Sequence, residues 1–517
     1  MRHLRRLSIS VSCIAAFYML FSGIALASPT DGGGATSTEL THGEIGLNLL
    51  WITIGAVLVI FMQAGFALVE TGFCRAKHAA HVVSTNFAIF GLGFIAFFAF
   101  GYAFMFGGYS FPGLFGYDKP IGDALIGSGN AVFLWKGGFF LTGAYDVAVL
   151  AFFLYMVAFM DTVATIPTGS MAERWKWKSF VMWGLFCGAI YYPLFGAWTW
   201  GGGWLAKLGS SLKLGHGYVD FAGSGVVHMV GGVAALAGAL VVGPRIGKFG
   251  PDGKPRTLPA HHIPMAMLGT FILLFGWFGF NAASTLGATD HRFTVVAANT
   301  AIAGAFGMVI AMLWVQLRSK SGKPDPGMMA NGMLAGLVAV TAPCAFIQPW
   351  AAAVIGMIAG LLVIESVWFI ERRGIDDPVG AISVHGVCGA LGVLAVGIFS
   401  DGSYGGDWNL TGSATQNIWG VLYTGGDGVG QLLAQVIGVA TIATVMFGLA
   451  YAFFKIQNAL TNGGIRPTAE VELAGLDIEE MGVLAYPEFS GLHPNGGTNG
   501  NGKSPSIEPV LTITTSS

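Results

Sequence analysis

The stretch DFAGSGVVHMVGG at residues 220–232 has a counterpart, DPVGAISVHGVCG, at residues 377–389. In each stretch an aspartate precedes a histidine by eight residues, and a glycine follows the histidine by four. Both histidines lie in apolar segments, where an ionisable side chain is costly and therefore points to a function. We interpret the two stretches as equivalent parts of two halves of one fold, with His228 and His385 at matching positions.

The composition indicates a membrane protein. Of 517 residues, 54% are hydrophobic, 10% are charged and 79 are glycine. These proportions exclude an ordinary soluble domain and are typical of helices packed closely in lipid, where small residues let backbones approach. The net charge of −2 excludes a strongly basic nucleic-acid-binding protein. The five cysteines show no CxxC spacing, so we expect no zinc site, no disulfide framework and no cofactor.

Eleven segments are long and apolar enough to span a bilayer, at about residues 46–69, 84–107, 146–171, 179–200, 219–243, 262–285, 295–317, 328–347, 349–370, 379–400 and 430–454. An odd number of spans places the two termini on opposite sides. Lys and Arg are concentrated in the connections after the odd-numbered spans, which predicts a mature N-terminus outside and a C-terminus in the cytoplasm. Because the two histidines fall in the fifth and tenth spans, we expect two inverted five-helix repeats plus a final helix.

The regions outside the spans differ in composition. A basic head, an apolar stretch and Ala25-Leu26-Ala27 predict a cleaved signal peptide at residues 1–27, with an uncleaved anchor as the alternative. We expect an external segment at 28–45, the transmembrane domain at 46–456 and a cytoplasmic regulatory tail at 457–489. Residues 490–517 are rich in Gly, Asn, Ser and Thr, which predicts a disordered C-terminal extension.

The two histidines have a structural and a functional interpretation. A single buried histidine is more commonly a core residue bonded to a neighbouring helix, but a symmetric pair favours a function. Two neutral imidazoles can share one hydrogen bond and leave their outer nitrogens to line a path through an apolar lumen.

The acids near the ends of the spans are expected to be structural. We expect Asp220 to cap the first turn of its helix, with electrostatic help for a cation as the alternative. Asp376 and Asp377 open the tenth span in a similar way. We expect Glu70, near the end of the first span, to pair with Arg75.

Several blocks of the chain resemble the ammonium transporters of the Amt/MEP/Rh superfamily, on the bacterial Amt side, over about residues 46–487. The blocks are FMQAGFA at 61–67 with RAK at 75–77, GSMAER at 169–174, WGGG at 200–203, DFAGSGVVH at 220–228, GWFGFNAAS at 276–284 and DDPVGAISVHGVCG at 376–389.

This resemblance implies a homotrimer in the inner (plasma) membrane, with one narrow pore in each subunit. It implies an external site for ammonium, or its analogue methylammonium, at Trp200, with Phe159 and Ser284 beside it and Asp220 as a support. It also implies a gate of stacked Phe159 and Phe280, and a pore lined by His228 and His385.

The resemblance extends to the cytoplasmic face. Glu173 would end the third span, and residues 475–486 resemble a regulatory tail. A PII-type trimeric signalling protein is an implied partner, and the basic connection at 244–261 is a candidate to receive it, although these charges fit a purely topological role equally well. Two departures from the family pattern are Asp161, which follows the presumed gate, and His78, which stands where asparagine is common.

Energetics connects these residues to a transport mechanism. Moving an intact ammonium ion into a dry interior costs tens of kcal/mol by idealised estimates, whereas a cation–π contact returns about 0.5–2 kcal/mol. We therefore expect NH4+ to be recognised outside, to lose its proton near the constriction and to pass as NH3, with or without the proton. The alternatives are an ammonium sensor that signals through its tail and a neutral gas channel of the Rh kind. An enzyme is not expected, because no nucleophile elbow is present.

Overall fold

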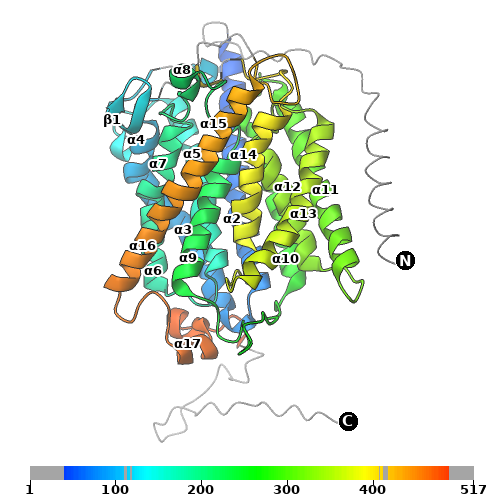
Figure 1. Cartoon of the computed structure of the whole chain (residues 1–517). Helices are drawn as coiled ribbons and strands as arrows, with labels where there is room; N and C mark the ends of the chain where they lie inside the picture. Colours follow the sequence, from blue (N-terminus) through cyan, green and yellow to red (C-terminus); the bar gives the residue numbers. More distant parts are fainter. Residues whose placement is uncertain (1–39, 110–112, 117–118, 407, 411–416, 488–517) are drawn as a thin grey trace, which may run out of the picture.

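The computed structural model describes residues 40–109, 113–116, 119–406, 408–410 and 417–487. The expected signal peptide at 1–27 and the expected extension at 490–517 lie outside these ranges. The described chain forms a bundle of long helices that run along a common direction (Figure 1).

Ten helical runs of the described chain are long and apolar enough to cross a membrane, and α12, with 16 residues, is a shorter apolar helix between them. Together they match the eleven expected spans in order. The runs are α2 (His42–Phe73), Ala76–Phe106 with α3 (Ala79–Ala96), η2 (Phe97–Gly101) and α4 (Tyr102–Phe106), α5 (Val147–Ser170), α6 (Trp177–Phe186) with η5 (Cys187–Tyr191) and α7 (Tyr192–Trp198), η6 (Ser224–Met229) with α9 (Val230–Val242), α10 (Ile263–Asn281) with η7 (Ala282–Thr285), α11 (Arg292–Arg318), α12 (Pro326–Thr341), α13 (Pro349–Arg372), η8 (Ile382–Val387) with α14 (Cys388–Phe399), and α15 (Gly428–Thr441) with η10 (Ile442–Met446) and α16 (Phe447–Leu460).

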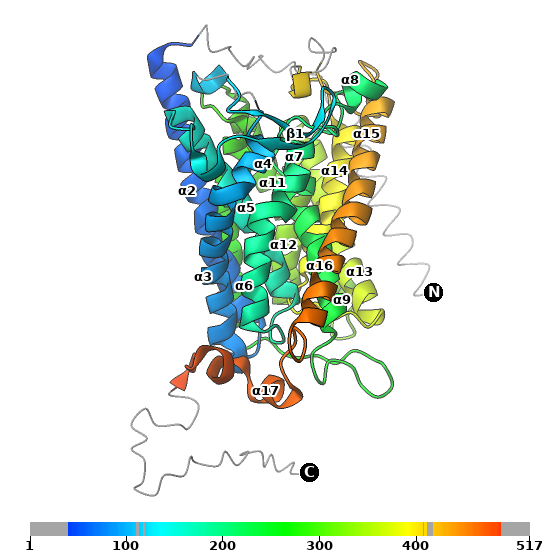
Figure 2. The ribbon, with the colours of Figure 1, turned by 90° about the vertical axis from the view of Figure 1, so that its left-hand side faces the viewer.

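The connections add little regular structure. A hairpin of β1 (Asp123–Ser128) and β2 (Ala131–Lys136) and the short α8 (Leu208–Leu212) lie at one end of the bundle (Figures 1 and 2). The short α17 (Ala469–Ala474) lies at the other end. The start of α2 and the helix α17 therefore lie at opposite ends of the bundle, as an odd number of spans requires. The last helix, α16, continues to Leu460, four residues beyond the expected end of the transmembrane domain.

The two histidine-bearing spans share an unusual start. Each begins with a π-helical turn, η6 or η8, inside which the histidine lies. π-Helical turns are rare in proteins, and those that occur are often at functional sites. Shortly before each turn a glycine adopts a positive φ, 118° at Gly223 and 82° at Gly380, which a side chain would resist. The sequence similarity of the two stretches thus corresponds to the same local backbone.

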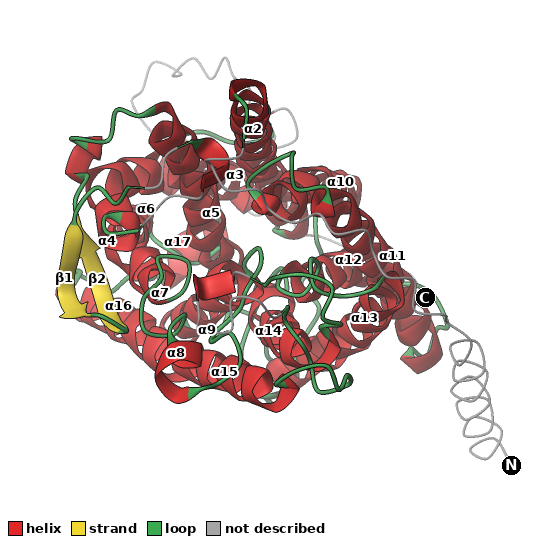
Figure 3. Ribbon diagram, turned by 90° about the horizontal axis from the view of Figure 1, so that it is seen from above, coloured by secondary structure: helices red, strands yellow, loops and turns green. Residues whose placement is uncertain are grey.

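Close backbone packing joins the two histidine-bearing spans. The glycines four residues after each histidine make this contact: Gly232 lies against His385 and Gly386, and Gly389 lies against Ser224 and Met229. Since the order of contacts along one segment is reversed along the other, the two segments run in opposite directions, as expected for inverted halves. Seen from above, α5, α9 and α14 lie toward the interior of the bundle (Figure 3).

Candidate functional site

The two repeat histidines meet at the crossing of η6 and η8. The Nδ1 atoms of His228 and His385 are 3.1 Å apart, and the ring planes are tilted by 25° at a centroid separation of 5.2 Å. Both residues are buried. At this distance one Nδ1 donates a proton and the other accepts it, so the outer Nε2 atoms have opposite hydrogen-bonding character when both rings are neutral. The Nε2 of His228 is buried and has no hydrogen-bond partner among the described residues.

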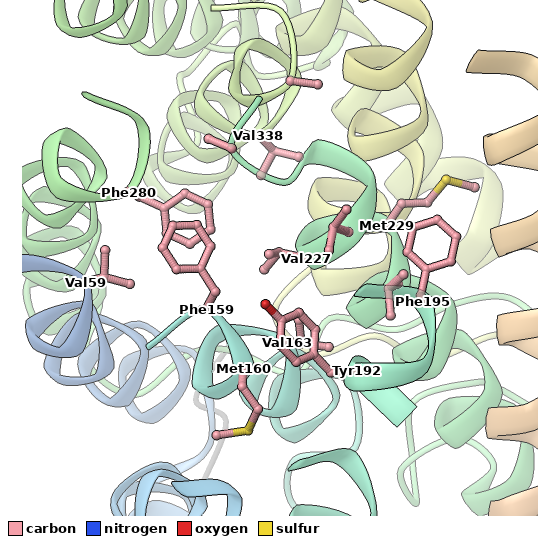
Figure 4. Close-up of a cluster of buried hydrophobic side chains, with 14 of the residues drawn as sticks. Val59, Phe159, Met160, Val163, Tyr192, Phe195, Val227, Met229, Phe280 and Val338 are labelled. Atoms are coloured by element: carbon pink, nitrogen blue, oxygen red, sulfur yellow. The ribbon is translucent and has the colours of Figure 1, made fainter. Parts of the chain in front are cut away.

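A column of aromatic rings continues from this pair. The Phe280 ring stacks on His228 at a centroid distance of 5.4 Å, and Phe159 stacks on Phe280 at 4.2 Å with a 29° tilt (Figure 4). Trp200 meets the Phe159 ring edge-on at 5.6 Å. The structure therefore brings together five of the seven site residues expected from the sequence, in the order Trp200, Phe159, Phe280, His228 and His385.

The outer end of the column is held by polar contacts. The α7 helix ends at Trp198, so Trp200 lies in the following turn rather than in the span, and its indole Nε1 donates to the Asp220 carbonyl oxygen at 2.7 Å. Ser284 lies in η7, where its hydroxyl bonds the Phe280 carbonyl and lies 3.1 Å from the Tyr155 hydroxyl.

Tyr155 is a site residue that sequence reasoning missed. Its ring is 4.8 Å from Phe159, and its hydroxyl bonds the carbonyl of Gly279. It therefore links the column to Ser284 on η7. The available signal was its position four residues before Phe159, which places the two rings on one face of α5.

Asp220 and Asp377 cap the two π-helical turns. Asp220 accepts hydrogen bonds of 2.8 Å each from the backbone N–H groups of Gly223, Gly225 and Val226. Asp377 accepts from Gly380 at 3.1 Å and Ile382 at 2.7 Å. Both carboxyl groups are thus occupied by helix-start amides. These contacts agree with the capping interpretation of the two aspartates.

The expected pair of Glu70 and Arg75 is wrong. The α2 helix ends at Phe73 and the chain turns at Cys74, which directs Arg75 toward Glu173 instead, at 2.5 Å. Glu70 stays on the inner face of α2, where its partners are the neutral side chains of Asn86 and Thr168.

A buried charge network lies at the α17 end of the bundle. Arg245 bonds Glu173 at 2.9 Å and Asp376 at 2.8 Å. Burial alone would raise the pKa of Asp376, but the guanidinium groups of Arg174 and Arg245 hold it well below its usual range. Burial opposes the ionised form of Glu173 in the same way, and Arg245 and Arg75 keep the pKa of that carboxyl below its ordinary value.

This network changes the interpretation of the connection at 244–261. Arg245 and Lys248 are engaged with acids of the same chain, Lys248 with Glu371. Lys254 and Arg256 are exposed. Half of the four basic residues in this connection therefore serve the fold rather than a free surface.

The tail docks on the same face. Asp477 accepts a hydrogen bond from the His81 N–H at 2.9 Å, and Glu472 accepts one from the Ile246 N–H at 2.7 Å. His78, the departure from the family pattern, accepts the Leu476 N–H at 3.3 Å. These contacts join the tail to the ends of two spans, at the start of α3 and just after α9.

Two other acids lie away from the column. Asp161 is buried on α5, and its Oδ1 has no hydrogen-bond partner within the part of the chain that the structure describes. Glu365 on α13 accepts from the Trp314 indole at 2.9 Å and lies 3.6 Å from Arg318. Among the described residues, no group of three His, Cys, Asp or Glu side chains is placed to hold a metal ion.

Comparison with known proteins gives consistent matches. The profile of the Ammonium Transporter Family matches residues 50–486. The protein named Ammonium transporter Amt2 of Archaeoglobus fulgidus is 44% identical over 480 residues, which cover 92% of this chain and 95% of that protein. A putative ammonium transporter of Synechocystis, sll1017, is 34% identical, with 90% and 94% covered.

Solved structures share the fold. A structure titled Sensor Amt Protein superposes with a TM-score of 0.73 at 34% identity, covering 86% of this chain and 100% of that one. The structure of Mep2 from Candida albicans gives a TM-score of 0.68 at 25% identity, with 89% and 95% covered.

Proposed function

The chain belongs to the ammonium transporter family, and we propose that it recruits NH4+ at Trp200, Phe159 and Ser284 and conducts NH3 along His228 and His385. The observation that carries this proposal is the continuous column of rings from Trp200 to His385. A π face binds a cation at the outer end, whereas imidazole nitrogens at the inner end bind a neutral hydrogen-bonding molecule.

Deprotonation is the step that selects ammonium. The two phenylalanine rings are in contact at 4.2 Å within a cluster of mostly apolar side chains, so a hydrated ion would lose its water here with little in return (Figure 4). An ion that gives its proton to water on the outer side, or passes it on to the histidine pair, continues as neutral NH3. K+ has no proton to release and stays outside. The unpartnered Nε2 of His228 is the first polar atom that NH3 meets below the gate.

The distribution of Lys and Arg supports an orientation in the inner membrane in which the first turn of α2 lies outside and the tail lies in the cytoplasm.

Exposed apolar side chains on α2 recur at intervals of three and four residues, at Leu47, Leu50, Ile54, Val57 and Phe61. This spacing forms a continuous stripe on one face of the helix, which supports packing against another subunit of a homotrimer.

Flux through liposomes reconstituted with the purified protein tests the proposal. Wild type should transport ammonium into the liposomes, with a current on a solid-supported membrane where the released proton follows the NH3, and the His228→Ala, His385→Ala double variant should lose most of this flux while it still purifies as a folded protein. Undiminished and still selective transport by the double variant would remove the role assigned to the histidines. Methylammonium should compete at the outer site, which a neutral gas channel would not show.

A sensor remains the second candidate, because the structure titled Sensor Amt Protein is covered along its full length by this chain at 34% identity. The tail contacts at Asp477 and Glu472 connect the bundle to a signalling partner. A PII-type protein is such a partner, and it would also contact the exposed Lys254 and Arg256. Binding of methylammonium without flux in the liposome assay would favour the sensor.

A further inference from the structure

A small cavity lies on the far side of the histidine pair from the gate. Its volume is about 20 Å³, which is room for one molecule the size of water or ammonia. Most of its walls are apolar side chains from α2, α5, α10, α12 and the start of the tenth span. Three polar residues interrupt them: His385, Glu70 and Asn331.

Glu70 is an acid without a cation. It is 3% exposed, and its carboxyl oxygens contact Asn86 Nδ2 at 2.7 Å and the Thr168 hydroxyl at 2.8 and 2.9 Å. Both partners are neutral, and no Lys, Arg or His side chain in the described part of the chain forms an ion pair with Glu70. A buried carboxylate is costly unless a positive charge compensates it.

Two glycines leave room for the polar side chains that line the cavity. A Cβ on Gly169 would lie 3.2 Å from Glu70 Oε1, and a Cβ on Gly380 would lie 2.7 Å from Asn331 Nδ2. Asn331 is 5% exposed and makes no hydrogen bond to another described residue, although its amide lines the cavity. The cavity therefore combines a buried acid that has no cationic partner with a side-chain amide that makes no hydrogen bond to another described residue.

We propose that this cavity is an inner binding site for NH4+, in which the Glu70 carboxylate and the Asn331 carbonyl accept hydrogen bonds from the ion. The inference rests on the proposed function and adds a second cation site to it. Hydrogen bonds from an ammonium group to a carboxylate are charge-assisted, and the apolar walls strengthen them. The outer site attracts the ion through aromatic faces. At the inner site, NH3 that has passed the histidines takes the proton of the Glu70 carboxyl, which leaves NH4+ beside a carboxylate until the ion departs to the cytoplasm and Glu70 takes up a proton again.

Uptake into membrane vesicles of known sidedness tests the inner site. Right-side-out vesicles present the outer face to added ammonium, and inside-out vesicles present the cytoplasmic face. Glu70→Gln keeps the size of the side chain and removes its charge. In inside-out vesicles it should raise the half-saturating ammonium concentration about tenfold, because one charged hydrogen bond is lost. In right-side-out vesicles the half-saturating concentration should not change. Glu365→Gln, which removes an acid on α13, is the matched control and should change neither.

The outcomes separate the two proposals. Absence of flux in wild type from either side would overturn the proposed function. Saturable flux in wild type with an unchanged inside-out value in Glu70→Gln would overturn the inner site alone. If Glu70→Gln does not fold, Asn331→Leu decides in the same assay, since it leaves the Glu70 contacts with Asn86 and Thr168 in place. A raised inside-out half-saturation in Asn331→Leu supports the site, and an unchanged value overturns it.

Discussion

Gly232 on α9 lies against Gly386 on η8 so closely that a Cβ on Gly232 would be 2.2 Å from the Gly386 nitrogen. The atoms facing this position are backbone, which cannot rotate away as a side chain can. The contact is one residue from His385 along η8, so it sets the distance between the two histidine-bearing segments. The glycine that follows each histidine by four residues is therefore a packing requirement of the imidazole pair.

Gly232→Ala should separate the two segments and weaken the His228–His385 contact. Overpacking of this kind costs about 1–3 kcal/mol, and more where backbone must move. We expect a lower Tm of the purified protein and a reduced ammonium flux into liposomes. Gly448→Ala on α16, where a Cβ meets no atom within 4 Å, is the control and should be neutral or slightly stabilising. Normal flux in Gly232→Ala would show that the pair tolerates a wider crossing.

Phe280→Ala should open the column between Phe159 and His228. Removing a buried phenylalanine costs about 3–5 kcal/mol in stability and leaves a cavity next to a polar ring. Water in that cavity would lower the barrier to ions, so we expect a K+ current that wild type does not carry. Phe275→Ala on the same helix removes a ring that is 57% exposed and should not admit K+. Retained K+ exclusion in Phe280→Ala would place the barrier elsewhere.

Glu173→Gln should be strongly destabilising. The carboxylate is fully buried and compensates both Arg75 and Arg245. Removing one member of a buried ion network costs about 3–5 kcal/mol because an unpaired charge is left behind. Thermal unfolding in detergent should show this loss, whereas Asp252→Asn, which breaks an exposed pair with Lys254, should change the Tm little. A Tm equal to wild type would mean that water reaches the network.

Asp377 gives the protein a specific pH dependence. Burial raises the pKa of Asp377 to about 6 despite hydrogen bonds from Ile382 and Ala381, whereas the ordinary value is 3.8. A raised pKa in the folded state means that the acid favours folding when protonated, so its contribution is full below about pH 4 and is lost as the pH rises through 6. Asp377→Asn keeps an acceptor oxygen and lacks this titration. The Tm of the variant relative to wild type should therefore increase between pH 4 and pH 7, and a constant difference would contradict the shift.

Much of the architecture could be predicted from local sequence. The eleven spans, the equivalence of the two histidine stretches and the capping by Asp220 and Asp377 depend on hydropathy and on residues close in the chain. The partner of Arg75 could not be predicted, because it depends on the direction in which the chain leaves α2 at Cys74. Tyr155 was missed for a related reason: its hydroxyl reaches η7, which is 129 residues away.

Sequence alone determined which residues lie in the bilayer and which positions the repeat makes equivalent, since the cost of burying charge and the length of an apolar helix are local properties. The tertiary structure decided which side chains meet. It placed the two Nδ1 atoms 3.1 Å apart and left Glu70 beside a cavity without a cation, because the crossing of η6 and η8 and the packing of α2 against α5 bring together residues that are far apart in the chain.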